Sequence, residues 1–63
     1  MLSVKELREL TGLSQDKFAE KYHISPSTLR KWERGARKTP EHYLWLLNEH
    51  FKYEGYFYDK NND

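Results

Sequence analysis

Apolar residues recur at helical spacing from the start of the chain. Val4, Leu7 and Leu10 lie three residues apart, which places them along one face of a helix. The Ser-Val-Lys-Glu sequence that begins at Ser3 is a capping box, and a glycine suited to a left-handed terminal residue follows the last turn. We predict a helix over residues 4–11 with these three apolar side chains on its buried face.

A second helical segment follows directly. Ser14 is a favourable N-cap, and Phe18, Ala19 and Tyr22 share one side of the helix that begins after it. We predict a helix over residues 15–22 and expect those three side chains to be buried.

A third segment opens with a strong start signal, serine followed by proline at Ser25 and Pro26. Serine can cap the helix, and proline is favoured at the first helical position because its missing N–H has no intrahelical partner there. We predict a helix over residues 26–34 that buries Leu29 and half-buries Trp32. Its other face is polar and carries Ser27, Arg30, Lys31 and Arg34.

The same pairing of a capping residue with proline recurs at Thr39 and Pro40, and it predicts a helix over residues 40–51. The core-facing stripe of this helix consists of Tyr43, Leu44, Leu47 and Phe51. Trp45 and Leu46 fall outside that stripe, so the helix is apolar around more than one face.

Beyond residue 51 the helical pattern ends in an aromatic segment at 53–58, which Gly55 interrupts. We expect this segment to be extended or turned back on the core, and residues 59–63 to fray. The chain is therefore expected to form a single all-α domain over residues 1–58, a compact unit of four to five helices.

The composition excludes several classes of protein. The chain has 63 residues, enough for one domain, and no cysteine, so it has no disulfide and no thiolate metal site, which fits a cytoplasmic protein. No apolar run is long enough for a signal peptide or a membrane span. The sequence lacks a phosphate-binding glycine loop, an HExxH motif and grouped histidines, so we expect neither an enzyme nor a bound metal or cofactor.

Charge is unevenly distributed along the chain. Residues 1–40 carry nine Lys/Arg and five Asp/Glu, a net charge of +4, whereas residues 41–63 carry two and five, a net charge of −3. One part of the surface therefore suits a polyanion, although the whole chain has a net charge of only +1. Ordinary solvated surface is the alternative interpretation of this pattern.

The two middle helices and the tight turn between them have the layout of a helix-turn-helix, which inserts its second helix into the major groove of DNA. Residues in the first turns of that helix meet base edges; here they are Ser25, Pro26, Ser27, Thr28 and Lys31. Lys31 can donate to guanine, whereas serine and threonine discriminate weakly and proline only touches a thymine methyl. DNA shape or a second subunit must therefore supply the remaining specificity.

The predicted phosphate contacts surround this helix. Gln15 offers amide donors and backbone N–H groups at a helix N-terminus, which suit a phosphate oxygen. Four cations accompany the second helix and the segment after it: Arg30, Arg34, Arg37 and Lys38. Glu33 interrupts this basic run, and we expect it to pair with a nearby cation rather than to contact DNA.

The segment from Leu7 to Pro40 resembles the Cro and phage-repressor-like (Xre-type) helix-turn-helix family. The matched positions are Gly12-Leu-Ser-Gln15, Phe18-Ala19-Glu20, Ile24-Ser25, Thr28-Leu29 and Trp32-Glu33-Arg34-Gly35. The resemblance implies a helical domain, usually of five helices, that often binds operator DNA as a dimer. It also implies that Pro26, Ser27 and Lys31 read bases and that Gln15 contacts a phosphate.

Two features depart from the family pattern. The family usually has glycine in the turn where this chain has His23, so we expect a left-handed backbone at His23 at a cost of about 1–2 kcal/mol. The family's fifth helix falls on residues 52–58, which contain Gly55 and three tyrosines. This composition leaves the form of the dimer interface open.

Three functions remain open. The first is a sequence-specific, double-stranded DNA-binding transcriptional regulator, a repressor, that forms a homodimer through Trp45, Leu46 and residues 53–58. The second is an antitoxin or operon partner whose aromatic C-terminal segment binds another protein, unless those rings only close the small core. The third is a helix-turn-helix scaffold that no longer binds DNA.

Overall fold

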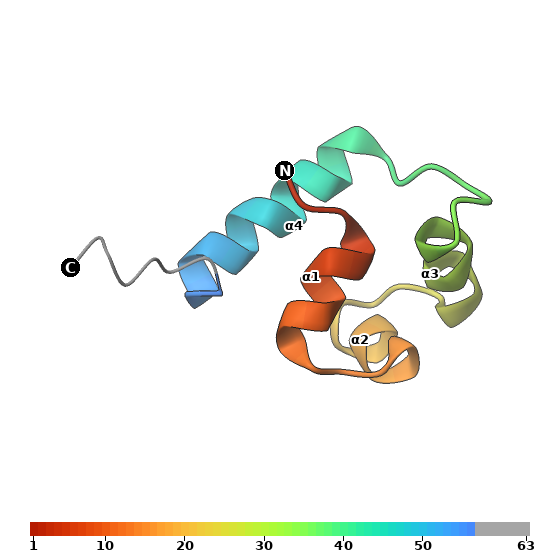
Figure 1. The fold of residues 1–63 in the computed structure, drawn as a ribbon, viewed down its shortest axis with the longest axis horizontal. Helices are drawn as coiled ribbons and strands as arrows, with labels where there is room; N and C mark the ends of the chain where they lie inside the picture. Colours follow the sequence, from red (N-terminus) through yellow and green to blue (C-terminus); the bar gives the residue numbers. More distant parts are fainter. Residues whose placement is uncertain (57–63) are drawn as a thin grey trace.

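Four helices account for most of the chain that the structure describes (Figure 1). The structure is a computed structural model that describes residues 1–56. Its helices are α1 (Val4–Thr11), α2 (Gln15–Lys21), α3 (Pro26–Glu33) and α4 (Glu41–Glu54). The predicted all-α fold is confirmed, with four helices and no strand within residues 1–56. The predicted fraying at 59–63 and the last two positions of the aromatic segment lie outside the described residues.

Local capping explains where α1 begins and ends. The Ser3 hydroxyl accepts a hydrogen bond from the Glu6 backbone N–H at 3.2 Å, and the Glu6 carboxylate accepts one from the Ser3 N–H at 2.9 Å. Gly12 follows with a φ of 74°, as the sequence predicts. The prediction that Leu10 is buried is wrong, since 45% of its surface is exposed. Steps of three residues drift around an α-helix by about 60° each, so the third apolar side chain has left the buried face.

The core lies where the four helices meet. Its buried side chains come from every helix and are Val4, Leu7, Phe18, Ala19, Leu29, Leu47 and Phe51. Tyr22, which the sequence places in the core, is half-buried and packs its ring 4.6 Å from that of Phe18. Trp45 and Leu46 are 50% and 46% exposed, so their predicted position outside the core stripe is confirmed.

A left-handed residue forms the turn between α2 and α3. His23 has a φ of 58°, which confirms the expectation from the sequence. The turn brings the Ile24 backbone N–H to 2.8 Å from the Ala19 carbonyl oxygen, and the half-buried Ile24 side chain packs against the core. α2 ends one residue earlier than predicted, at Lys21, and α3 ends one residue earlier, at Glu33.

The last helix differs most from its predicted bounds. Its N-cap is Pro40 rather than Thr39, and the helix continues past residue 51 to Glu54, where Gly55 ends it with a φ of 89°. The helix continues beyond its last apolar core position because no residue that breaks helices occurs before Gly55. Tyr56 then turns back, with its ring 4.7 Å from that of Phe51. One aromatic side chain of the predicted segment thus belongs to the core.

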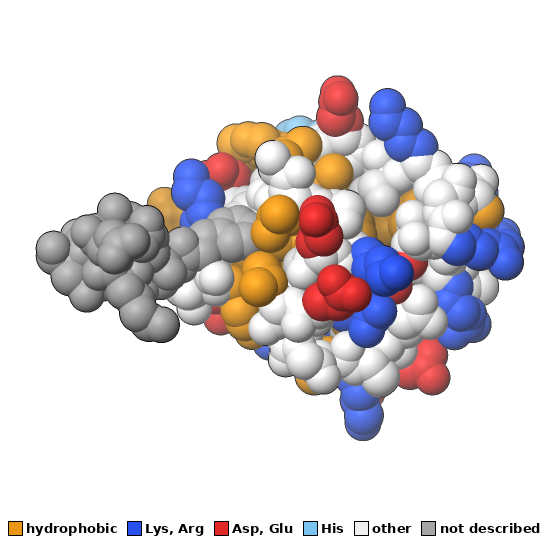
Figure 2. Space-filling view, in the orientation of Figure 1, with side chains coloured by type: hydrophobic (Ala, Val, Ile, Leu, Met, Phe, Trp, Pro, Cys, Tyr) orange, Lys and Arg blue, Asp and Glu red, His pale blue; other side chains and the backbone are white. Residues whose placement is uncertain are grey.

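Basic and apolar side chains gather at different places on one face of the molecule. On the face drawn in Figure 2, Lys and Arg side chains crowd the end that contains α3, whereas hydrophobic side chains lie over α1 and α4 nearer the opposite end. Within residues 1–56, no helix has the length and apolarity needed to cross a bilayer.

Candidate functional site

The first turn of α3 presents polar groups to solvent. Ser25, Pro26 and Ser27 are exposed and Thr28 is half-buried, while Lys31 is exposed one turn further along. The buried Leu29 holds the opposite face of α3 against the core. This places the predicted base-reading side chains together on one side of the helix.

The N-terminus of α3 retains unused backbone donors. Ser25 is the N-cap, but within the described chain its side chain makes no capping hydrogen bond; its Oγ lies 3.1 Å from the Oγ of Ser27. The first residue is proline, which has no N–H. The backbone N–H groups of Ser27 and Thr28 therefore receive no side-chain cap, and they can donate to an anionic oxygen.

The predicted phosphate-contacting cations are all exposed: Arg30, Arg34, Arg37 and Lys38. Arg30 lies 3.4 Å from an Asp16 carboxylate oxygen, but 52% and 78% of the two side chains are exposed. A pair this exposed contributes little to stability and leaves the guanidinium free to rotate toward another partner. Among residues 1–56, the other three cations have no ion pair within 4 Å.

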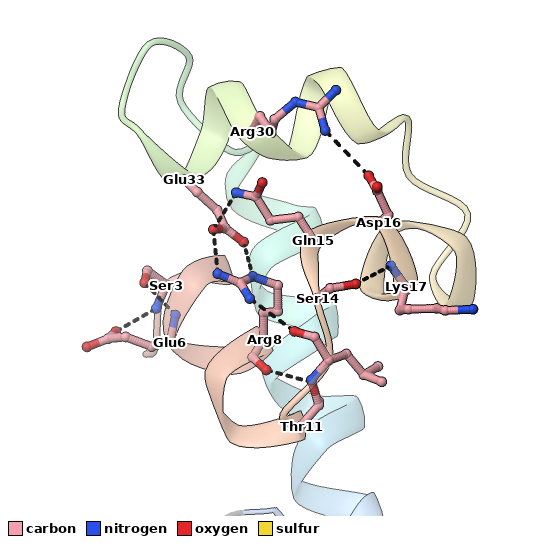
Figure 3. A network of polar contacts seen from close by, with 11 residues as sticks. Ser3, Glu6, Arg8, Thr11, Ser14, Gln15, Asp16, Lys17, Arg30 and Glu33 are labelled. Carbon is pink, nitrogen blue, oxygen red and sulfur yellow. Dashed lines mark hydrogen bonds and ion pairs between the residues drawn. The ribbon is translucent and has the colours of Figure 1, made fainter.

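Glu33 is the centre of a partly buried polar network, drawn in Figure 3. One carboxylate oxygen accepts from Arg8 Nε at 2.6 Å, and the other accepts from an Arg8 terminal nitrogen and from Gln15 Nε2, both at 3.0 Å. Only 5% of the Glu33 side chain is exposed. The expectation that Glu33 pairs with a cation is confirmed, and a single carboxylate connects α1, α2 and α3.

These contacts set the ionisation of the pair. Burial alone raises the pKa of Glu33, but the hydrogen bonds from Arg8 and Gln15 outweigh it, so the pKa lies below its usual value. The hydrogen bond to Glu33 raises the pKa of Arg8. Both groups are therefore charged at neutral pH, and the pair adds no net charge to the surface above it.

Gln15 is held in place by this network. Its Nε2 donates one hydrogen bond to Glu33, which leaves the second amide hydrogen and the amide oxygen for an external group. The side chain lines a hollow of about 360 Å³ together with Lys5, Arg8, Arg30, Glu33 and Arg34. Four cations surround one paired carboxylate there, and this arrangement suits an anionic oxygen such as that of a phosphate.

Lys5 and Arg8 are the residues that the sequence analysis missed. They lie three positions apart on α1, outside the helix-turn-helix, and join the hollow only because α1 packs against α3. The signal in the sequence is their spacing, because two basic residues three positions apart lie on the same face of a helix. Arg37 and Lys38 do not join this hollow, since they lie in the segment between α3 and α4.

The histidines and acids form no metal site in the part of the chain described. No group of three or more metal-binding side chains occurs within residues 1–56.

Comparison with known families agrees with this geometry. A family model described as helix-turn-helix matches residues 4–56, which include all four helices. The chain belongs to this Xre/Cro-like helix-turn-helix family, whose members are DNA-binding regulatory proteins. It is therefore a DNA-binding helix-turn-helix protein. No match was found among curated proteins or solved structures.

Proposed function

We propose that this protein is a sequence-specific transcriptional repressor that reads double-stranded DNA with α3 in the major groove. The observation that carries the proposal is the start of α3, where Ser25, Pro26 and Ser27 are exposed, together with the exposed cations along this helix and after it. Repression needs only stable occupation of an operator, and an exposed helix start with cations near it is suited to that task.

Base recognition falls to a small set of groups. Lys31 donates to guanine O6 or N7, and the hydroxyls of Ser27 and Thr28 donate or accept. The Pro26 side chain cannot form a hydrogen bond, so it only contacts a thymine methyl group. Because this set discriminates weakly, we expect sequence-dependent DNA shape and a second half-site to supply much of the specificity.

Two groups of residues supply the phosphate contacts. Gln15, Lys5, Arg8, Arg30 and Arg34 line the hollow between α1 and α3. Arg37 and Lys38 lie in the segment after α3 and share a second hollow with Lys5. Phosphate contacts from both groups fix the position of α3 in the groove.

Selection of bound sites from random duplexes tests sequence recognition directly. Two inverted half-sites about one helical turn apart are expected for a homodimer. Fluorescence anisotropy against the selected site should then give a slope of log K against log salt near −7, on the basis of about four phosphates neutralised per subunit. A flat salt response contradicts the proposal.

A charge-matched pair of variants locates the surface. Arg30→Ala with Lys31→Ala should abolish specific binding, because it removes a phosphate contact and the main base contact together. Lys21→Ala with Lys52→Ala removes the same charge away from α3 and should reduce affinity less than about tenfold. Equal losses from both double variants would show that binding depends on net charge alone.

A protein-binding role is favoured by a second observation. Trp45, Leu46 and Tyr53 are 50%, 46% and 90% exposed on α4. Aromatic and aliphatic side chains of this kind form the centres of protein interfaces. We propose that Trp45, Leu46 and residues 53–58 form the homodimer interface. The alternative is that the protein is an antitoxin or operon partner and that its aromatic C-terminal segment binds another protein.

Truncation separates these roles from core packing. Tyr56 packs on Phe51, so a chain ending at Tyr56 should keep its fold. Sedimentation should show whether that chain, or the double variant Trp45→Ser with Leu46→Ser, becomes monomeric while helical circular dichroism is retained. Unchanged self-association in both would exclude this face as the dimer interface.

A further inference from the structure

A second groove shares Lys5 and Glu33 with the hollow described above. It has a volume of about 520 Å³ and opens between α1, the segment after α3 and the start of α4. Its lining includes Val4, Lys5, Trp32, Arg37, Lys38 and Leu44. A groove of this size falls in the range of small-molecule sites, which are mostly apolar with a few placed polar groups.

The floor of the groove is apolar and partly aromatic. Val4 is buried, and Trp32 and Leu44 are half-buried. Trp32 packs against Tyr43 with ring centroids 5.6 Å apart, and it is one of the residues that line the groove. A flat aromatic body can bury surface against such a floor.

The rim carries a surplus of positive charge. Lys5, Arg37 and Lys38 have no ion pair within 4 Å among the residues that the structure describes. Of the two acids that line the groove, Glu33 is already paired with Arg8, which leaves Glu41 alone to oppose three cations. The surplus favours an anionic group at the rim.

We propose that this groove binds a small aromatic carboxylate, with the ring over Trp32 and the carboxylate between Lys5 and the cations at 37 and 38. Arg37 and Lys38 are also proposed phosphate contacts. A bound carboxylate therefore competes with DNA for the same side chains, and the ligand acts as an inducer that releases the operator. This regulatory part rests on the proposed function, whereas ligand binding itself does not.

Nuclear magnetic resonance provides a test with an internal control, because the protein has two tryptophans. Indole-3-acetate should shift the indole N–H signal of Trp32, which lines the groove, and leave that of Trp45, which does not, in place. Indole-3-acetamide, which lacks the charge, should bind about tenfold more weakly. Parallel shifts of both tryptophans, or equal affinities for acid and amide, overturn the proposal.

Charge variants give an independent readout. Lys5→Gln and Lys38→Gln should each weaken indole-3-acetate binding about fivefold, and Lys17→Gln, an exposed lysine outside the groove, should not. All three positions are exposed, so the fold should tolerate each change. Equal weakening in the three variants contradicts a defined site.

Competition with DNA distinguishes the two proposals. Saturating indole-3-acetate should weaken operator binding, while indole-3-acetamide at the same concentration should have little effect. Unchanged operator affinity overturns the inducer role. Absence of DNA binding before any ligand is added overturns the repressor function and the competition with it, and the tryptophan shifts still decide whether the groove binds a carboxylate.

Discussion

Asn48 in the middle of α4 holds both backbone polar groups of Leu2, 46 positions earlier in the chain. Its Oδ1 accepts from the Leu2 N–H at 2.9 Å, and its Nδ2 donates to the carbonyl oxygens of Leu2 at 3.0 Å and Leu44 at 2.9 Å. Asn48 is only 6% exposed. The side chain thus fixes the segment before α1 to α4 through bonds that water does not readily replace.

Removal of the Asn48 amide should lower the free energy of unfolding. Asn48→Ala leaves the Leu2 N–H and C=O without partners, so we expect the free energy of unfolding to fall by about 2–3 kcal/mol. Urea denaturation measures the loss, and faster amide exchange at Leu2 locates it. Glu49→Ala, at the neighbouring and less buried position, is the control and should cost less than about 1 kcal/mol. Equal stability of the two variants would show that the Asn48 bonds contribute nothing.

The Arg8–Glu33 pair should make stability depend on pH. The folded-state pKa of Glu33 is lowered, so the folded protein binds fewer protons than the unfolded chain at pH values between the two pKa values. Its contribution is fully present above the unfolded pKa of 4.5 and is lost as the pH falls through the lower folded value. Chemical denaturation between pH 7 and pH 3 should show this fall in the wild type.

Two variants isolate the pair from other acids. In Glu33→Gln the free energy of unfolding should fall less between pH 7 and pH 3, the acid limb of the stability profile, because the group that titrates is gone. Arg8→Met leaves Glu33 buried without its cation and should cost about 2–3 kcal/mol at pH 7, whereas Arg8→Met with Glu33→Leu should recover most of the loss. An acid limb that is identical in Glu33→Gln and the wild type would assign the effect to other carboxylates.

The left-handed turn offers a stabilising substitution. His23 has a φ of 58° and an exposed side chain, so His23→Gly removes backbone strain without loss of packing. We expect a gain of about 1 kcal/mol and a higher melting temperature. Gly12→Ala is the reciprocal control, because Gly12 has a φ of 74° and a Cβ there meets no atom within 4 Å. It should destabilise by a similar amount through strain alone.

Tyr22 carries a hydroxyl that packing has buried. Within residues 1–56 that hydroxyl has no hydrogen-bond partner, and burial raises the pKa of Tyr22. Tyr22→Phe keeps the ring contacts with Phe18, His50 and Phe51 and removes the unsatisfied group. Thermal unfolding should therefore show equal or greater stability, by up to about 1 kcal/mol. A clear loss would mean that the hydroxyl finds a partner in solution.

Local signals account for most of what the sequence predicts correctly. Caps at Ser3 and Ser14, glycine at Gly12 and the turn at His23 depend on neighbours a few residues away, so they can be recognised without knowledge of the fold. Apolar spacing does not locate the end of α4, because that helix continues for three residues after its last buried apolar side chain before Gly55 ends it. It does not locate the buried face at Leu10 either, because strict three-residue spacing drifts around the helix.

The candidate site was predicted only where it follows from the helix-turn-helix itself. Arg8 and Lys5 join it through the packing of α1 against α3, and Arg8 lies 25 positions from Glu33. The engagement of Gln15 with Glu33 likewise spans 18 positions. Sequence spacing does not show which residues this far apart come into contact, because such contacts depend on how the helices are arranged in three dimensions.

The shared Glu33 carboxylate couples the positions of three helices. Because it accepts from Arg8 on α1 and Gln15 on α2, a displacement of α3 would break contacts with both neighbouring helices at once. The three helices are therefore expected to move as a preorganised unit. A partner that docks on α3 pays little ordering entropy, and its dwell time depends mainly on the contacts that it makes.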